Sequence, residues 1–151
     1  MEYREMETDS QVLERLMALS EDWEKENSCR GYRRNGIEDI RGNRVFAALE
    51  GEEIMGYLFG HEKEDQKATS AIPQGARVFW VEELYVCPAY RCRGVGRKLF
   101  TLAQEKLKEE GMEYLDLSTA TKDYKAILHF YIEELGMEFW SAQLFKKLTG
   151  D

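Results

Sequence analysis

The chain has 151 residues, a formal net charge of −8 and an apolar fraction of 43%, which together favour one globular domain over residues 1–151. No apolar run approaches the roughly 20 residues of a membrane span, residues 1–7 are too acidic for a signal peptide, and the acidic balance argues against binding nucleic acid. We therefore expect a cytoplasmic protein without a membrane or nucleic-acid partner.

Cysteine and histidine usage gives no sign of a metal site. The three cysteines, Cys29, Cys87 and Cys92, cannot all pair and lack metal-ligand spacing, so we interpret them as reduced thiols. Cys87 and Cys92 lie beside basic residues that favour a thiolate, but filler positions in a loop that works through its backbone are the favoured interpretation. The two histidines, His61 and His129, have no partner at ligand spacing.

The N-terminal third predicts a strand, a helix and a long loop. Residues 2–7 alternate loosely, as an edge strand does, and residues 8–10 (Thr-Asp-Ser) can cap a helix. Apolar residues from Gln11 to about Trp23 recur on one helical face. Residues 24–43 have no sustained period and contain three glycines, which predicts a loop with one short helix near Ile37. A loop of this length is usually functional or mobile.

Three strands should follow. Residues 44–50 and 53–61 flank the turn Glu50-Gly51-Glu52 and form a hairpin, while the polar stretch 61–75 reads as a connection. Residues 78–86 are rich in β-branched and aromatic side chains, and this strand should stop at Pro88, which cannot donate to a ladder. The order predicts an antiparallel meander.

A basic loop with two glycines leads from this meander into a helix. Gly94 and Gly96 lack side chains, Arg91, Arg93 and Arg97 add positive charge, and the helical stripe begins at residue 95 and can end at residue 111. The first turn of a helix presents unpaired N–H groups and a positive dipole end, so this loop suits an anionic phosphate. It matches neither the P-loop pattern nor the full dinucleotide fingerprint.

The last third predicts a strand, a helix and a final strand region. Residues 114–120 should form a strand parallel to residues 78–86, because a helix separates the two. Residues 122–134 have helical spacing, and Gly136 is placed to end that helix. We expect residues 138–148 to return as the last strand or strands.

Two segments resemble one known family. Residues 91–96 read Arg-Cys-Arg-Gly-Val-Gly and resemble the acyl-CoA signature Arg/Gln-x-x-Gly-x-Gly/Ala of the GNAT superfamily of N-acetyltransferases. Residues 86–91, Val-Cys-Pro-Ala-Tyr-Arg, are also typical of that family, and residues 130–136 resemble its second motif. The element order agrees over nearly the whole chain.

The resemblance implies an α/β fold: a mixed, mainly antiparallel sheet of six to seven strands flanked by about four helices and opened where two central strands splay. It implies acetyl-CoA as co-substrate, no metal, and an amine acceptor. The residues implied to bind the cofactor are Leu84, Tyr85 and Val86 for the pantetheine arm and Arg91, Cys92, Arg93, Gly94, Val95, Gly96 and Arg97 for the pyrophosphate.

The resemblance also implies proton-handling residues. A primary amine has a pKa of about 10, so a base must accept its proton before attack. Glu82 stands where the family often carries this base, and Glu83 is a second site residue for binding the acceptor, on the opposite strand face if alternation holds. Tyr131 matches the usual general acid for the leaving thiolate. The alternatives are two solvent-facing carboxylates and a tyrosine that covers the core.

Some features leave alternatives open. The family usually has four residues from this tyrosine to the glycine, whereas this chain has five, which puts the direction of the Tyr131 hydroxyl in question. A non-catalytic CoA-binding module and an unrelated phosphate-binding protein are the alternative functions. The acceptor, a small cationic amine or a peptide, is not identified, and a homodimer is compatible with the resemblance. Acidic residues that suit a cationic acceptor are Glu21, Asp22, Glu24, Glu26, Glu38 and Asp39.

Overall fold

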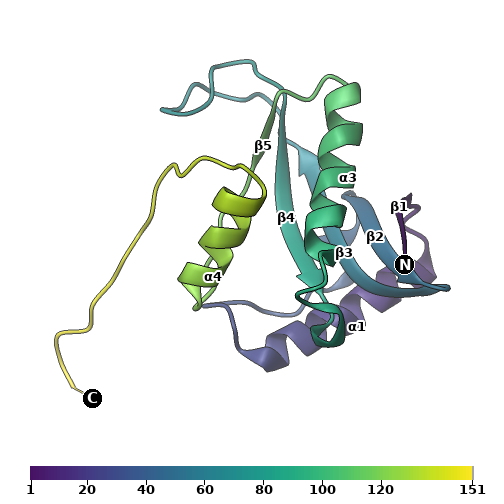
Figure 1. Ribbon diagram of the computed structural model, residues 1–151. Helices are drawn as coiled ribbons and strands as arrows, with labels where there is room; N and C mark the ends of the chain where they lie inside the picture. The colour runs from purple at the N-terminus through teal and green to yellow at the C-terminus, as the bar shows by residue number, and fades with distance from the viewer. Residues whose placement is uncertain (151) are drawn as a thin grey trace.

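A twisted five-stranded sheet forms the centre of the computed structural model, which describes residues 1–150 (Figure 1). The strands lie in chain order, and the first four are antiparallel while the last two are parallel. Their bounds are β1 (Glu2–Met6), β2 (Arg44–Glu50), β3 (Glu53–Glu62), β4 (Val78–Val86) and β5 (Tyr114–Asp116). The predicted meander and the parallel crossover are therefore confirmed.

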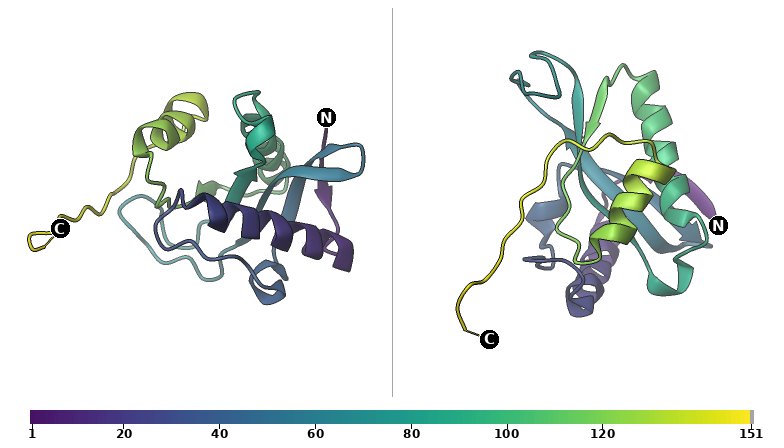
Figure 2. Two further views of the ribbon diagram at one scale, coloured as in Figure 1. Left: turned by 90° about the horizontal axis from the view of Figure 1, so that it is seen from below. Right: turned by 60° about the vertical axis from the view of Figure 1, so that its left-hand side comes forward.

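Helices cover both faces of the sheet (Figure 2). They are α1 (Ser10–Glu26), α2 (Ile37–Ile40), α3 (Val95–Glu109) and α4 (Tyr124–Leu128), the last continuing as a π-helix over His129–Glu134. The Asp9 side chain caps α1 by accepting a hydrogen bond from the Val12 amide at 2.9 Å. Among residues 1–150, the structure contains no helix with the length and apolarity that crossing a bilayer requires.

Two apolar clusters hold these layers together. One lies between α1 and a face of the sheet, and the other between α3 and the opposite face. Strand β2 contributes to both, because Val45 and Ala47 belong to the first cluster and Phe46 and Ala48 to the second. The central strands are thus buried on both faces, and the site described below lies where β4 leaves this core.

The sheet has fewer strands than the sequence predicted. We expected six to seven, with residues 138–148 as the last ones, but the described chain forms five, and residues 136–148 have no regular structure. The strand expected at residues 114–120 is limited to Tyr114–Asp116. A strand needs a partner for its backbone groups, and within residues 1–150 no segment pairs with the outer edge of β5.

A β-bulge interrupts β4 at Glu82. Phe59 of β3 pairs with Glu83 and Gly60 pairs with Val81, so Glu82 has no residue opposite it. A Cβ atom at Gly60 would lie 2.1 Å from the Trp80 carbonyl oxygen, which leaves room only for glycine. The simple alternation from which Glu82 and Glu83 were expected on opposite faces is therefore broken at this point.

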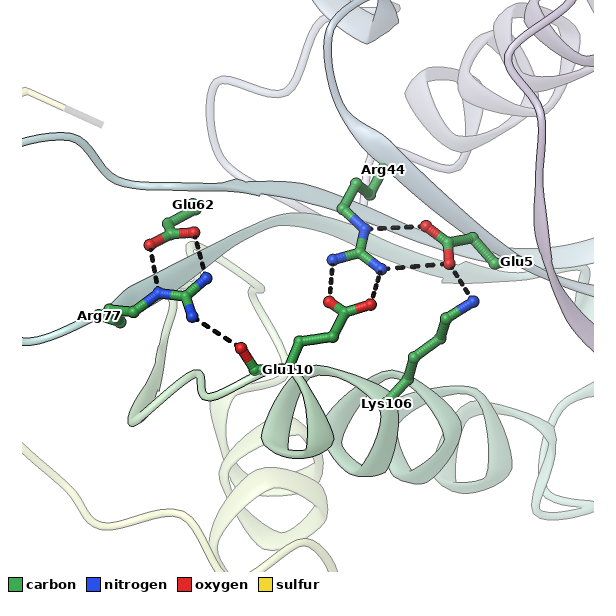
Figure 3. Close-up of polar contacts among 6 residues, drawn as sticks. All are labelled: Glu5, Arg44, Glu62, Arg77, Lys106 and Glu110. Atoms are coloured by element: carbon green, nitrogen blue, oxygen red, sulfur yellow. Dashed lines mark hydrogen bonds and ion pairs between the residues drawn. The ribbon is translucent and has the colours of Figure 1, made fainter.

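Ion pairs tie the end of α3 to the sheet (Figure 3). The Arg44 guanidinium donates to Glu5 at 2.8 Å and to Glu110 at 2.6 Å, and Lys106 also pairs with Glu5. Arg77 donates to the Glu110 carbonyl at 2.7 Å. The hydrogen bond from Arg44 is the main cause that lowers the pKa of Glu5, against the opposing effect of burial.

This lowered pKa predicts acid sensitivity. A carboxyl group with a depressed folded-state pKa contributes stability above its unfolded pKa of about 4.3, and that contribution is lost as the pH falls through the folded pKa. We expect Arg44→Met to lower the unfolding free energy by about 1 kcal/mol at pH 7 and to make its decline in acid shallower. Urea titrations from neutral to acidic pH measure this. Arg4→Met, which removes an exposed pair with Glu2, is the control; equal acid slopes in wild type and Arg44→Met would contradict the assignment.

Candidate active site

Strands β4 and β5 pair over a short distance and then separate. Their ladder has three residue pairs, Val78 with Tyr114, Phe79 with Leu115, and Trp80 with Asp116. Beyond Trp80, the side of β4 that faces β5 has no ladder partner as far as Val86. The expected splay is present, but it lies between β4 and the edge strand β5 rather than between two central strands. It leaves the backbone groups of residues 84–86 that point away from β3 open to another molecule, except the Val86 carbonyl, which accepts a hydrogen bond from Arg91.

Glu83 lies at the centre of a polar network beside this opening. Its Oε1 accepts hydrogen bonds from the Tyr32 hydroxyl at 3.1 Å and the Tyr57 hydroxyl at 2.9 Å, and its Oε2 accepts one from Asn35 Nδ2 at 2.8 Å. Burial raises the pKa of the Glu83 carboxyl even though these hydrogen bonds act in the opposite direction. The long loop between α1 and β2 supplies Tyr32 and Asn35, so it folds over this carboxylate.

Sequence reasoning missed the partners of Glu83. Tyr57 lies in the apolar alternation of β3 and reads as a core residue, while Tyr32 and Asn35 lie in a loop without a period. Their separations from Glu83 are 26, 51 and 48 residues, so no local pattern connects them. The length of the loop was the only available signal.

Glu82 has a different environment from its neighbour. Its side chain is 40% exposed, and its Oε1 lies 3.6 Å from His61 Nδ1. His61 Nδ1 also lies 3.0 Å from Asn43 Oδ1. One carboxylate at the bulge is therefore half-buried and fixed by three donors, and the other is exposed beside the His61 imidazole.

The glycine loop begins α3 as expected. Gly94 is the residue before the helix, with φ of 79°, and a Cβ there would meet no atom within 4 Å. Glycine at position 94 permits the left-handed backbone conformation, which residues with a side chain disfavour. A Cβ on Gly96 would lie 3.3 Å from Phe130 Cζ, so this glycine allows α3 to pack closely against the segment that carries Tyr131.

Arg91, the first residue of the signature, bridges α1 and β4. Its Nη1 and Nη2 lie 2.7 and 2.9 Å from the two carboxylate oxygens of Glu26, and its Nε donates to the Val86 carbonyl at 2.8 Å. Burial opposes ionisation of Glu26, but hydrogen bonds from Arg91 and Tyr85 outweigh it and hold the pKa of that carboxyl below its ordinary value. Arg91 thus fixes the end of β4 from which the signature loop starts.

Other acidic residues near α1 are paired with arginines rather than free for a cation. Arg34 lies 3.1 Å from Glu21 and 3.6 Å from Glu24, and Arg41 lies 3.1 Å from Glu38. These pairs reduce the local negative charge. The argument for a cationic acceptor therefore depends on Glu82 and Glu83 more than on the acidic composition of residues 21–39.

Tyr131 lies on the π-helix that follows α4. The Leu135 amide donates to the Phe130 carbonyl at 3.0 Å, a five-residue step that accommodates the extra residue before Gly136. The Tyr131 ring packs against Phe100 and Phe130, with centroids 6.4 and 5.1 Å away.

The Tyr131 hydroxyl is unengaged. Burial raises the pKa of Tyr131, which keeps the group protonated and able to donate. In the described chain the Tyr131 hydroxyl forms no hydrogen bond. Every fully buried side-chain oxygen or nitrogen of residues 1–150 has a hydrogen-bond partner, so this unpartnered hydroxyl is accessible to solvent. A donor that is free at the surface is available to another molecule.

The cysteines do not form a reactive centre. All three are free, and burial raises the pKa of Cys87, which disfavours a thiolate nucleophile. Within residues 1–150 no group of three or more histidine, cysteine or acidic side chains is arranged to hold a metal ion.

Comparison with protein families gives one match. The model of the acetyltransferase (GNAT) family matches residues 12–137, which include all the predicted site residues. No curated protein matches the chain in sequence.

Several solved structures share the fold. An aminoglycoside acetyltransferase from an uncultured soil metagenomic sample is 17% identical with a TM-score of 0.70, over 98% of this chain and 96% of that one. Aminoglycoside N-acetyltransferase AAC(6')-Iy in complex with CoA is 18% identical with a TM-score of 0.67, over 99% and 100%. A transcriptional regulator from Bacillus halodurans is 23% identical with a TM-score of 0.68, over 97% and 100%. At these identities the likeness establishes the fold alone.

Proposed function

The chain belongs to the acetyltransferase (GNAT) family, and from this premise we propose that it transfers the acetyl group of acetyl-CoA to a primary amine. The observation that carries the proposal is the arrangement at the end of β4. An unpaired strand edge, two carboxylates at a bulge and a glycine-led helix N-terminus follow one another within residues 81–97.

The chain's own groups fit acetyl-CoA. Within residues 84–86, the β4 backbone groups that point away from β3 can bond to the amides of a pantetheine arm, apart from the Val86 carbonyl, which Arg91 already engages. The first-turn amides of α3, with Arg93 and Arg97 nearby in sequence, suit a pyrophosphate. Acetyl-CoA supplies a thioester whose carbonyl carbon an amine can attack.

We assign separate roles to the two carboxylates. Glu83, fixed by three donors, holds the acceptor ammonium near the opening of the sheet. Glu82, exposed and beside His61, accepts the proton that the ammonium must lose and can pass it to solvent. Tyr131 donates a hydrogen bond or a proton to the departing sulfur. Positioning of the amine against the thioester contributes most, up to about 7–11 kcal/mol of the barrier in favourable cases.

A thiol-release assay tests this function. Acetyl-CoA is offered with a panel of polyamines, aminoglycosides, amino acids and short peptides; aminoglycosides are included because two structural neighbours acetylate them. Acceptor-dependent thiol release is the expected result. CoA binding by calorimetry without release with any acceptor would favour the alternative, a non-catalytic CoA-binding module.

The glycine loop gives a second test. We expect Gly94→Val to weaken CoA binding by about tenfold or more, equivalent to about 1.4 kcal/mol or more, because a branched side chain resists the left-handed conformation that shapes the loop. Gly75→Val is the matched control, since Gly75 has the same φ of 79° and equally open surroundings but lies in the β3–β4 loop. Titration calorimetry with CoA distinguishes the two; equal affinities would refute the phosphate-binding role.

A further inference from the structure

Glu82 and Glu83 face the same side of the sheet, although they are neighbours on β4. Val81, just before them, and Leu84, just after them, both pack into the apolar cluster beside α3. Side chains alternate along a strand, so Glu82 and Glu83 each point to the opposite face, which α1 covers. Tyr57, a donor to Glu83, belongs to the cluster on that face. The bulge thus lets both carboxylates act on one bound molecule.

A serine interrupts the apolar stripe of α1 on the same face. Ser20 is 0% exposed, and it follows Leu19 and lies one turn after Leu16, both in the core. A buried hydroxyl costs free energy unless it is hydrogen-bonded, and the loop between α1 and β2 supplies both partners. The Asn35 backbone N–H donates to Ser20 Oγ at 2.8 Å, and the Tyr32 hydroxyl oxygen lies 2.6 Å from the same atom. Polar contacts rather than packing therefore explain this serine.

The hydrogen bonds of this group run in one direction, toward Glu83. The Tyr32 hydroxyl has one proton and donates it to Glu83 Oε1, because an ionised carboxylate can only accept. Ser20 must then supply the proton between the two hydroxyls, and the Asn35 N–H supplies the hydrogen bond to Ser20. Hydrogen bonds in such a chain polarise one another. Ser20 therefore strengthens the hydrogen bond from Tyr32 to Glu83.

The ring of Tyr32 is held independently of its hydroxyl. Its centroid lies 4.3 Å from that of the Trp23 ring, and Trp23 in turn stacks on Tyr85 at 5.2 Å. Exchanging tyrosine for phenylalanine at position 32 thus removes the hydroxyl and keeps the ring contact.

Glu83 keeps one acceptor position for a ligand. A carboxylate has about four lone-pair positions. The chain's own donors use three of them, with Tyr32 and Tyr57 on Oε1 and Asn35 Nδ2 on Oε2. The remaining position, on Oε2, suits one N–H of an ammonium group.

We infer that Ser20 and Tyr32 are positioning residues for the acceptor: their hydroxyls hold the Glu83 carboxylate where its remaining lone pair meets the acceptor ammonium. Ser20 acts through Tyr32, and Tyr32 acts through Glu83. The inference rests on the proposed acetyl transfer, in which Glu83 holds the acceptor. It adds that a residue in the core of α1, without contact to the acceptor, contributes to acceptor affinity.

Steady-state kinetics give the first test, with the panel amine that shows the fastest thiol release as acceptor. Tyr32→Phe should raise the acceptor KM by about tenfold, the size of one hydrogen bond to a charged group, and Ser20→Ala should raise it by a smaller factor. The value of kcat and the CoA affinity should stay near wild type, because lost ground-state binding raises KM alone. Ser10→Ala, at the exposed first residue of α1, and Tyr3→Phe, at a half-buried tyrosine on β1, are the controls.

The outcomes separate this inference from the function on which it rests. A wild-type KM in both variants of an active enzyme would overturn the positioning role alone. The absence of thiol release by wild type with every amine would refute the proposed function, and this role with it. A fall in kcat and CoA affinity that follows a lower unfolding midpoint in urea would show a structural role instead.

Combined substitutions test the order of the chain. Ser20→Ala added to Tyr32→Phe should raise the KM no further, because Ser20 acts through the hydroxyl that is already absent. Neither substitution should change the KM in a Glu83→Gln background. Residues that act through one another are non-additive in this way, so additive effects would contradict the chain.

The titration of Glu83 tests the same chain without any acceptor. The titratable groups that face this carboxyl are Glu82 on β4, Tyr57 on β3 and Tyr32 in the loop. Burial raises the pKa of Glu83 and the hydrogen bonds oppose it, so losing the Tyr32 hydroxyl should raise that pKa further. Carbon-13 NMR of the glutamate carboxyl groups, assigned with Glu83→Gln, measures this. Tyr32→Phe and Ser20→Ala should both raise the pKa and Tyr3→Phe should not; an unchanged pKa in both chain variants would overturn the inference.

Discussion

Replacing Tyr131 with phenylalanine is expected to lower kcat by about 10²–10⁴-fold, the usual contribution of a positioned general acid, while CoA affinity stays unchanged. Phenylalanine keeps the ring contacts with Phe100 and Phe130, and the Tyr131 hydroxyl has no hydrogen bond within the described chain to lose. The substitution therefore removes a proton donor and little else.

Three measurements separate this role from a structural one. Turnover comes from thiol release, CoA affinity from calorimetry, and the unfolding midpoint from a urea titration. Tyr114→Phe, at a 37% exposed tyrosine on β5, is the control and should behave as wild type in all three. Wild-type turnover in Tyr131→Phe would end the assignment, and a loss of turnover accompanied by an equal loss of stability would point to packing instead.

Gly60→Ala is expected to destabilise the fold by about 3 kcal/mol or more, at the upper end of the usual effect of overpacking. The added Cβ would lie 2.1 Å from the Trp80 carbonyl oxygen and 2.8 Å from Phe79 Cε1. The obstructing oxygen belongs to the backbone of β4, so it cannot move aside without disturbing the β3–β4 ladder at the bulge.

The unfolding free energy in urea measures this effect. Gly36→Ala is the matched control, because its Cβ would meet only Asp39 Oδ2 at 3.7 Å and its φ of −89° suits any residue. It should change stability by less than about 1 kcal/mol. Similar stabilities for the two variants would mean that the bulge relaxes around a methyl group and does not fix Glu82 and Glu83 rigidly.

Local patterns accounted for most of the fold. The strands β1 to β4, the helices α1 and α3, and the parallel crossover to β5 follow from apolar periodicity and from the positions of Gly51, Pro88 and Gly94. These signals suffice because a helix cap or a strand end depends on residues close in sequence. The five-residue spacing from Tyr131 to Gly136 is accommodated locally by a π-helical turn, which keeps the Tyr131 ring against the α3 side of the core.

The number of strands could not be predicted in the same way. Residues 138–148 have the composition of a strand, yet a strand forms only where another edge accepts its hydrogen bonds, and one chain leaves this segment unpaired. The composition of residues 138–148 favours a strand, but whether the strand forms depends on a second strand edge that pairs with it.

The sequence by itself determined the family, through the signature at residues 91–96 and the order of the elements, because the chemistry of that loop resides in adjacent backbone groups. Only the tertiary structure decided how the two acidic residues differ. Tyr32, Asn35 and Tyr57 reach Glu83 from distant segments, and the bulge opposite Gly60 leaves Glu82 exposed beside His61. Burial and long-range hydrogen bonds set the pKa of a carboxyl group, and neither can be predicted from the residues next to it in the sequence.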